Sequence, residues 1–152
     1  MYSTDRTTLR RVFVDLLERL DRGERARDDN ERRLAQVLVE HPEYHPLLRR
    51  SEAALARDFP AEAGAGNPFL HMALHLSLRE QRALGQPEQV ARLHRQLALA
   101  TGQDDHAIEH AMMECLSEAI WQAQQSGAPA SERVYLKCLA RLGMRYGLTL
   151  ED

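Results

Sequence analysis

Six of the seven histidines fall in pairs spaced four residues apart. These pairs are His41/His45, His71/His75 and His106/His110. Random placement of seven histidines in a chain of this length would give roughly 0.3 such pairs. In an α-helix, residues i and i+4 share one face, so two imidazoles with this spacing can bind the same metal ion. The pattern therefore predicts a transition-metal site, for which Zn²⁺ and non-haem iron are the best-suited ions.

The first pair lies in a segment that two prolines interrupt. Pro42 suits a first helical turn, whereas Pro46 is expected to move the preceding residue, His45, out of the α region. We therefore do not expect His41 and His45 to share the face of a regular helix, and we do not assign them to the metal site.

The second pair lies well inside a predicted helix that begins at the N-cap Asn67 and runs to about Leu84. His71 and His75 share a narrow sector of this helix with arginine side chains. Such a sector is either a solvated polar strip or a polar seam that faces the third histidine pair. The sequence leaves both interpretations open.

The third pair lies on a helix predicted from about residue 104 to residue 125, and this helix carries a misplaced carboxylate. At 100° per residue, Glu109 falls on the apolar arc, between the directions of Leu116 and Ile120. A buried carboxylate needs a specific partner, because burying it alone costs several kcal/mol or protonates it. We expect that partner to be a metal ion, a histidine, or an arginine such as Arg79.

The candidate metal ligands are thus taken from two helices and are His71, His75, His106, Glu109, His110 and Glu114. Residues 106–110 also match the inverted zinc-protease motif His-x-x-Glu-His, but the fold that carries this motif is too large for an all-helical chain of this size. No catalytic residue is assigned. If the chain is an enzyme, metal-assisted hydrolysis or oxygen chemistry would follow. The alternative function is a metal-free helical module for protein interaction or homo-oligomerisation.

The elements that must position these groups are helices with short connections. Apolar residues recur with a helical period along nearly the whole chain, and no convincing alternating strand is visible. We expect one all-α domain of residues 1–152, an antiparallel bundle of about six helices. Its front helices lie at 1–58, a loop at 59–66 and the main bundle at 67–147.

Composition excludes several classes of protein. The chain has 152 residues, a net charge of −3 and dispersed acidic and basic residues, so nucleic acid is not a favoured partner. No apolar run is long enough to span a bilayer, and the N-terminus does not resemble a cleaved signal. Cys115 and Cys138 form no Cys-x-x-Cys motif, and we expect reduced thiols in a cytoplasmic protein.

Several strings in the sequence resemble one known family. They include His41-Pro-Glu-Tyr-His45, Asn67-Pro-Phe-Leu-His-Met-Ala-Leu-His75 and Glu109-His-Ala-Met-Met-Glu-Cys115. They are similar to the family named domain of unknown function 1841, and the resemblance covers nearly the whole chain. It implies a bacterial cytoplasmic protein, from a family found mainly in proteobacteria. It supplies no catalytic residues.

Overall fold

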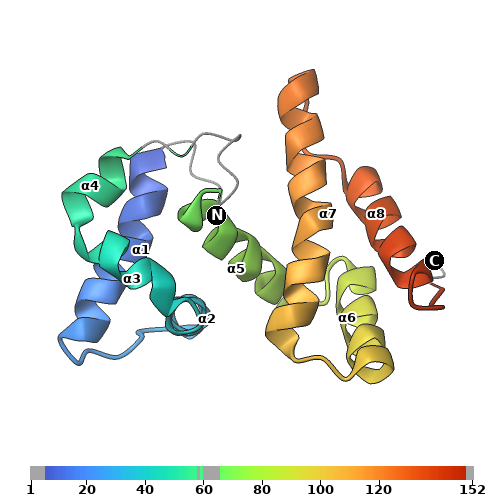
Figure 1. Ribbon diagram of the computed structural model, residues 1–152, viewed down its shortest axis with the longest axis horizontal. Helices are drawn as coiled ribbons and strands as arrows, with labels where there is room; N and C mark the ends of the chain where they lie inside the picture. The colour runs from blue at the N-terminus through green and yellow to red at the C-terminus, as the bar shows by residue number, and fades with distance from the viewer. Residues whose placement is uncertain (1–5, 58, 60–65, 150–152) are drawn as a thin grey trace. The chain divides into compact units, whose positions relative to one another are not determined.

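The computed structural model describes residues 6–57, 59 and 66–149, and every regular element within these ranges is a helix (Figure 1). The predicted all-α class is confirmed. The chain forms two compact units, Met1–Leu76 and Ser77–Asp152, which are described separately below. Their boundary lies within a helix rather than at the predicted loop, and the single-domain organisation stays a prediction. No helix in the described ranges is long and apolar enough to cross a membrane.

The first unit contains five complete helical elements and the beginning of a sixth. They are α1 (Arg6–Asp21), α2 (Asp29–Val39), the 3-10 helix η1 (Pro42–Tyr44), α3 (His45–Arg49), α4 (Ser51–Ala56) and α5 (Pro68–Leu84) as far as Leu76. Side chains cap two of the helices. The Asp28 carboxylate accepts the Glu31 N–H at 2.8 Å at the start of α2. The Asn67 side chain accepts the Phe69 N–H at 2.9 Å at the start of α5, where Asn was the predicted N-cap.

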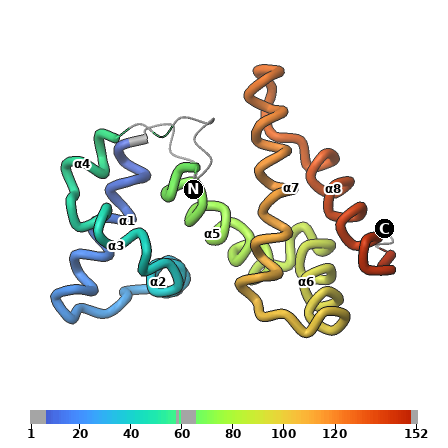
Figure 2. The backbone as a smooth tube through the Cα atoms, in the orientation of Figure 1, coloured from blue at the N-terminus to red at the C-terminus, as the bar shows by residue number. Residues whose placement is uncertain are grey.

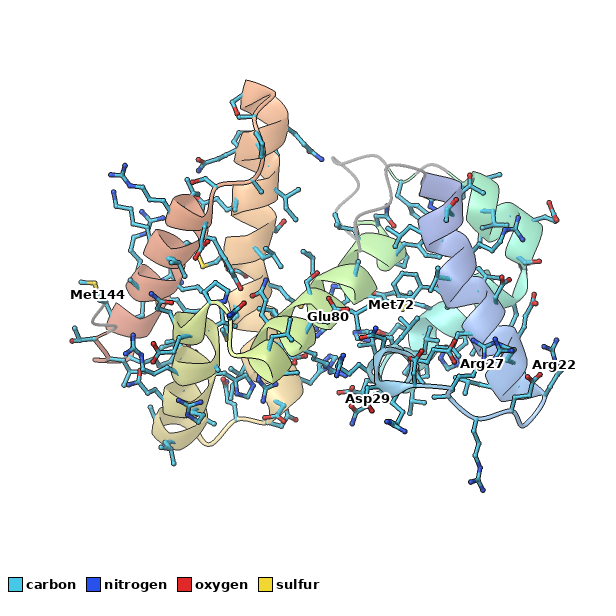
Figure 3. The ribbon with its side chains drawn as sticks, turned by 180° about the vertical axis from the view of Figure 1, so that it is seen from behind. Arg22, Arg27, Asp29, Met72, Glu80 and Met144 are labelled. Carbon is cyan, nitrogen blue, oxygen red and sulfur yellow. A yellow bond between two sulfur atoms is a disulfide. The ribbon has the colours of Figure 1, made fainter. Side chains whose placement is uncertain are left out.

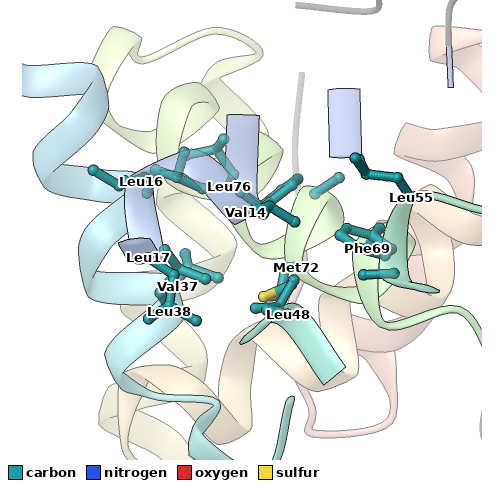
Figure 4. Packing of buried hydrophobic residues seen from close by; sticks show 14 residues of the cluster. Val14, Leu16, Leu17, Val37, Leu38, Leu48, Leu55, Phe69, Met72 and Leu76 are labelled. Atoms are coloured by element: carbon teal, nitrogen blue, oxygen red, sulfur yellow. The ribbon is translucent and has the colours of Figure 1, made fainter. Parts of the chain in front are cut away.

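The core of the first unit forms where α1 packs against α2, α3 and α4 (Figure 4). The largest fully buried apolar side chains of this core include Phe13, Leu38, Leu48, Phe69 and Met72. Arg22, Arg27 and Asp29 are exposed around the connection from α1 to α2 (Figure 3). This core fixes the end of α2 and the first turns of α5, which carry the histidines discussed below.

The second unit contains the rest of α5 together with α6 (Glu88–Thr101), α7 (Asp105–Ser126) and α8 (Glu132–Met144). Helices α7 and α8 lie side by side, and α6 packs against both (Figure 2). Gly102 and Gly127 end α6 and α7 with φ angles of 68° and 72°, a left-handed conformation that glycine adopts at little cost. The core consists of side chains from α5 to α8, among them Leu78, Val90, Leu93, Leu97, Ile108, Met112, Leu116 and Leu139.

The number of helices differs from the predicted six. The described residues form eight α-helices and one 3-10 helix, because the segment after α2 is divided into three short elements. Pro42 opens η1, Pro46 lies in the first turn of α3, and Arg50 (φ −92°, ψ 60°) separates α3 from α4. Most of the predicted loop at 59–66, namely residues 60–65, lies outside the described residues.

The expectation of reduced cysteines is wrong. Cys115 on α7 and Cys138 on α8 form a disulfide, with their Cα atoms 5.4 Å apart. The two residues are 23 positions apart in the sequence, so no local motif marks them. They meet because the turn after Gly127 lays α8 alongside α7.

Candidate metal centre

Three imidazoles come together in the first unit: His41, which follows α2, and His71 and His75 on α5. Their ring centroids are 5.0 Å apart for His41 and His71, 4.8 Å for His41 and His75, and 4.9 Å for His71 and His75. Each ring offers a nitrogen that lies within 4.8 Å of the corresponding nitrogens of the other two rings. These three residues form the three-histidine cluster.

The end of α2 fixes the orientation of the His41 ring. His41 precedes η1 outside any helix, and its ring is 1% exposed. Its Nδ1–H donates to the Val37 carbonyl oxygen at 2.8 Å; since a carbonyl only accepts, this bond assigns the proton to Nδ1. In the neutral ring Nε2 then carries the lone pair, and a backbone carbonyl that fixes the tautomer in this way is typical of metal-binding histidines.

The sequence interpretation did not place His41 beside His71 and His75. The i, i+4 spacing pairs it with His45, whereas the structure pairs it with α5. One signal could have identified it: a histidine just beyond a helix C-terminus can donate to the carbonyls that the last turn leaves unpaired.

His45 occupies a position that corrects a second expectation. It has helical angles (φ −58°, ψ −42°) and begins α3, although Pro46 follows it. A proline is tolerated in a first turn, where its missing N–H would have no helical partner. The His45 Nε2–H donates to the Leu38 carbonyl oxygen at 2.7 Å, so this ring supports the end of α2 and is not part of the three-histidine cluster.

The other two rings of the cluster lie one turn apart on α5. His75 is fully buried and His71 is half-buried, so the interpretation of this sector as a solvated strip is wrong for His75. Tyr44 of η1 borders the cluster: its ring is parallel to that of His41 with centroids 5.5 Å apart, and it lies 6.0 Å from His71. Burial raises the pKa of the Tyr44 hydroxyl, so this residue stays a neutral phenol near pH 7.

The spacing of the three rings can be compared with that of a zinc site. Tetrahedral Zn–N bonds of about 2.1 Å place ligand nitrogens roughly 3.4 Å apart. The cluster nitrogens lie within 4.8 Å of one another, which is wider than a bound ion requires, so the rings would have to approach one another on binding. The three ligands are imidazoles without a carboxylate. This donor set suits Zn²⁺ better than non-haem iron, which favours two histidines and a carboxylate.

The remaining predicted ligands lie on α7 in the second unit. His106 and His110 are neighbours on this helix, with ring centroids 4.3 Å apart, and Glu114 is exposed one turn further on. That they join the α5 histidines in one site stays a prediction.

Glu109 is fully buried, as its wheel position predicted, and its partners are arginines. Arg79 Nε donates to both carboxylate oxygens at 3.1 Å, and Arg79 Nη2 donates to Oε1 at 3.0 Å. Arg82 Nη1 donates to Oε2 at 3.3 Å. Of the three predicted kinds of partner, the structure therefore contains the arginine, and all three residues belong to the second unit.

Fold and site together define an all-α protein with a three-histidine cluster in one unit and a buried arginine–glutamate pair in the other. The chain belongs to the family described as "Domain of unknown function (DUF1841)", whose model matches residues 5–141. The resemblance noted in the sequence is thereby confirmed. Neither a curated protein nor a solved structure matches the chain.

Proposed function

We propose that the chain binds a transition metal ion, Zn²⁺ in the first place, through His41, His71 and His75. The observation that carries this proposal is the convergence of three imidazoles from two separate elements, two of them buried, with ring centroids 4.8–5.0 Å apart. His41 presents Nε2 as its lone-pair nitrogen because Val37 accepts the proton on Nδ1. Both features describe how the three rings are placed and oriented, and not only that three histidines are present.

Metal binding at this cluster would depend on pH. Coordination requires neutral imidazoles and competes with protonation, so zinc retention should weaken as the pH falls. A bound dication would replace contacts among the rings with three strong bonds.

Three protein ligands leave one tetrahedral position for water or substrate. Zinc sites of this composition lower the pKa of the bound water and support hydrolysis. Non-haem iron is the second candidate ion, and it would need a carboxylate from outside the three-histidine cluster.

Metal content measured on purified full-length protein tests the proposal. After loading with zinc and extensive dialysis, we expect one zinc per chain, and His75→Ala and His41→Ala should each lower retention by at least about 100-fold in Kd, since losing one of three ligands removes several kcal/mol. His71→Asn provides a milder variant, because this ring is half-buried and its loss disturbs the fold least.

Two matched controls separate ligand loss from damage to the fold. His45→Gln removes a half-buried ring from the same segment, and His94→Gln removes a ring that is 3% exposed in the second unit. Both variants should retain zinc like the wild type. His110→Ala tests the predicted contribution of the third histidine pair. If the wild type fails to retain zinc, nickel or iron, or if both controls lose it equally, the metal proposal is wrong.

The failure of metal binding would favour the alternative, a metal-free helical module for protein interaction or homo-oligomerisation. Sedimentation velocity at two protein concentrations measures self-association directly. A bacterial source and a cytoplasmic location stay predictions from composition and family resemblance.

A further inference from the structure

The second unit contains a small groove between α7 and α8 that the metal proposal does not use. It encloses about 130 Å³ and opens to solvent. Both cysteines of the disulfide line it, together with Glu114 and Glu118 of α7, Arg141 of α8 and Arg145 at the end of α8. The disulfide therefore lies among four charged side chains.

These charges are sorted by helix. Glu114 and Glu118 are one turn apart on α7, and Arg141 lies on α8 four residues before Arg145, which caps the end of that helix, so one wall is acidic and the other is basic. Among the described residues, no ion pair within 4.0 Å joins the two walls. The groove can thus offer a cationic and an anionic contact to the same ligand.

The two cysteine residues differ in exposure. Cys115 is 2% exposed, whereas Cys138 is only half-buried. Thiol–disulfide exchange requires in-line approach of a thiolate to one sulfur, and access decides which sulfur is attacked. An incoming thiolate therefore reaches Cys138, and Cys115 is the leaving group.

We propose that this groove is a binding and exchange site for small thiols that carry both a carboxylate and an ammonium group, such as cysteine-containing peptides. The carboxylate pairs with Arg141 or Arg145 and the ammonium with Glu114 or Glu118, which places the thiolate against Cys138. The thiolate bonds to the Cys138 sulfur, and the Cys115–Cys138 bond breaks to release the Cys115 thiolate. A second thiol then attacks the mixed disulfide at the ligand sulfur. Two thiols are oxidised to one disulfide, and the protein gains two electrons and two protons.

The test measures how fast two thiols reduce the disulfide of the full-length protein. Glutathione carries carboxylate and ammonium groups, whereas 2-mercaptoethanol carries neither. Quenching by alkylation and mass spectrometry gives the fraction reduced with time. Dividing each rate by that of the same thiol with a small uncharged disulfide removes differences in thiol pKa and nucleophilicity. We expect the normalised glutathione rate to exceed that of 2-mercaptoethanol at least about fivefold, the effect of one or two exposed ion pairs.

Paired variants distinguish the groove from the overall charge of the protein. Arg141→Gln with Arg145→Gln should bring the ratio of the two normalised rates close to one. Arg95→Gln with Arg133→Gln changes the net charge equally at exposed positions outside the groove and should keep the ratio. The proposal is overturned by a wild-type ratio near one, by equal loss in both pairs of variants, or by two free thiols per chain in protein purified in air.

Discussion

Replacing Glu109 by Gln should destabilise the second unit strongly, because it leaves buried positive charge without a counter-charge. The carboxylate is 0% exposed and Arg79 is 10% exposed, so neither group is well hydrated in the folded chain. Breaking a buried ion pair costs about 3–5 kcal/mol. We expect a value near the lower end, about 3 kcal/mol, because Arg82 is 29% exposed and remains partly hydrated. For a chain of this size, that loss lowers Tm by roughly 6–12 °C.

Urea unfolding followed by circular dichroism measures the change, and a double variant tests its cause. Arg79→Met combined with Glu109→Leu removes both charges and should recover most of the lost stability, since buried ion pairs often exchange for apolar groups at little cost. Arg82→Gln removes the partly exposed partner and should cost less than about 1 kcal/mol. A loss below about 1 kcal/mol for Glu109→Gln, or a double variant as unstable as the single one, would refute the reasoning.

Three further changes test the cores, the disulfide and a buried histidine. Leu76→Ala should cost about 2–5 kcal/mol in urea unfolding, because this 5% exposed side chain belongs to the core of the first unit; a loss under about 1 kcal/mol would contradict that role. Cys138→Ser should lower the free energy of unfolding by about 3 kcal/mol, because the disulfide joins residues 23 positions apart and so restricts the unfolded chain. Dithiothreitol should produce the same loss in the wild type but none in the variant. Burial, followed by the charge of Arg82, lowers the pKa of His94, so the unfolded chain binds this proton more tightly and stability should fall as the pH decreases below about 6.5. Between pH 7.5 and pH 5.5, the free energy of unfolding should decrease less in His94→Gln than in the wild type. An equal decrease in both proteins would contradict the assignment of this pH dependence to His94.

The hydrophobic periodicity of the sequence predicted the features that depend on interactions within a single helix. The long helices, the Asn67 cap and the burial of Glu109 all follow from a 3.6-residue repeat and from capping chemistry. The arginine partner of Glu109 was one of three alternatives, because a helical wheel shows the direction of a side chain but not what another helix presents to it.

What the sequence could not show depends on contacts between distant segments. His41 joins His71 across 30 positions because α1, α2 and α3 pack into one core with the start of α5, and no spacing rule encodes that packing. The same holds for Cys115 and Cys138, which the pairing of α7 with α8 brings together. The elements η1 and α3 were missed because a proline signals a helix start as well as a helix break.

X-ray absorption at the zinc edge tests the metal proposal most directly. In zinc-loaded full-length protein, we predict a four-coordinate ion with about three imidazole nitrogens near 2.0–2.1 Å and no sulfur ligand. His75→Ala should reduce the imidazole count or abolish retention, whereas His45→Gln should leave the spectrum unchanged. A six-coordinate shell without the multiple-scattering signal of imidazole, or a spectrum that His75→Ala does not alter, would contradict a zinc site at His41, His71 and His75.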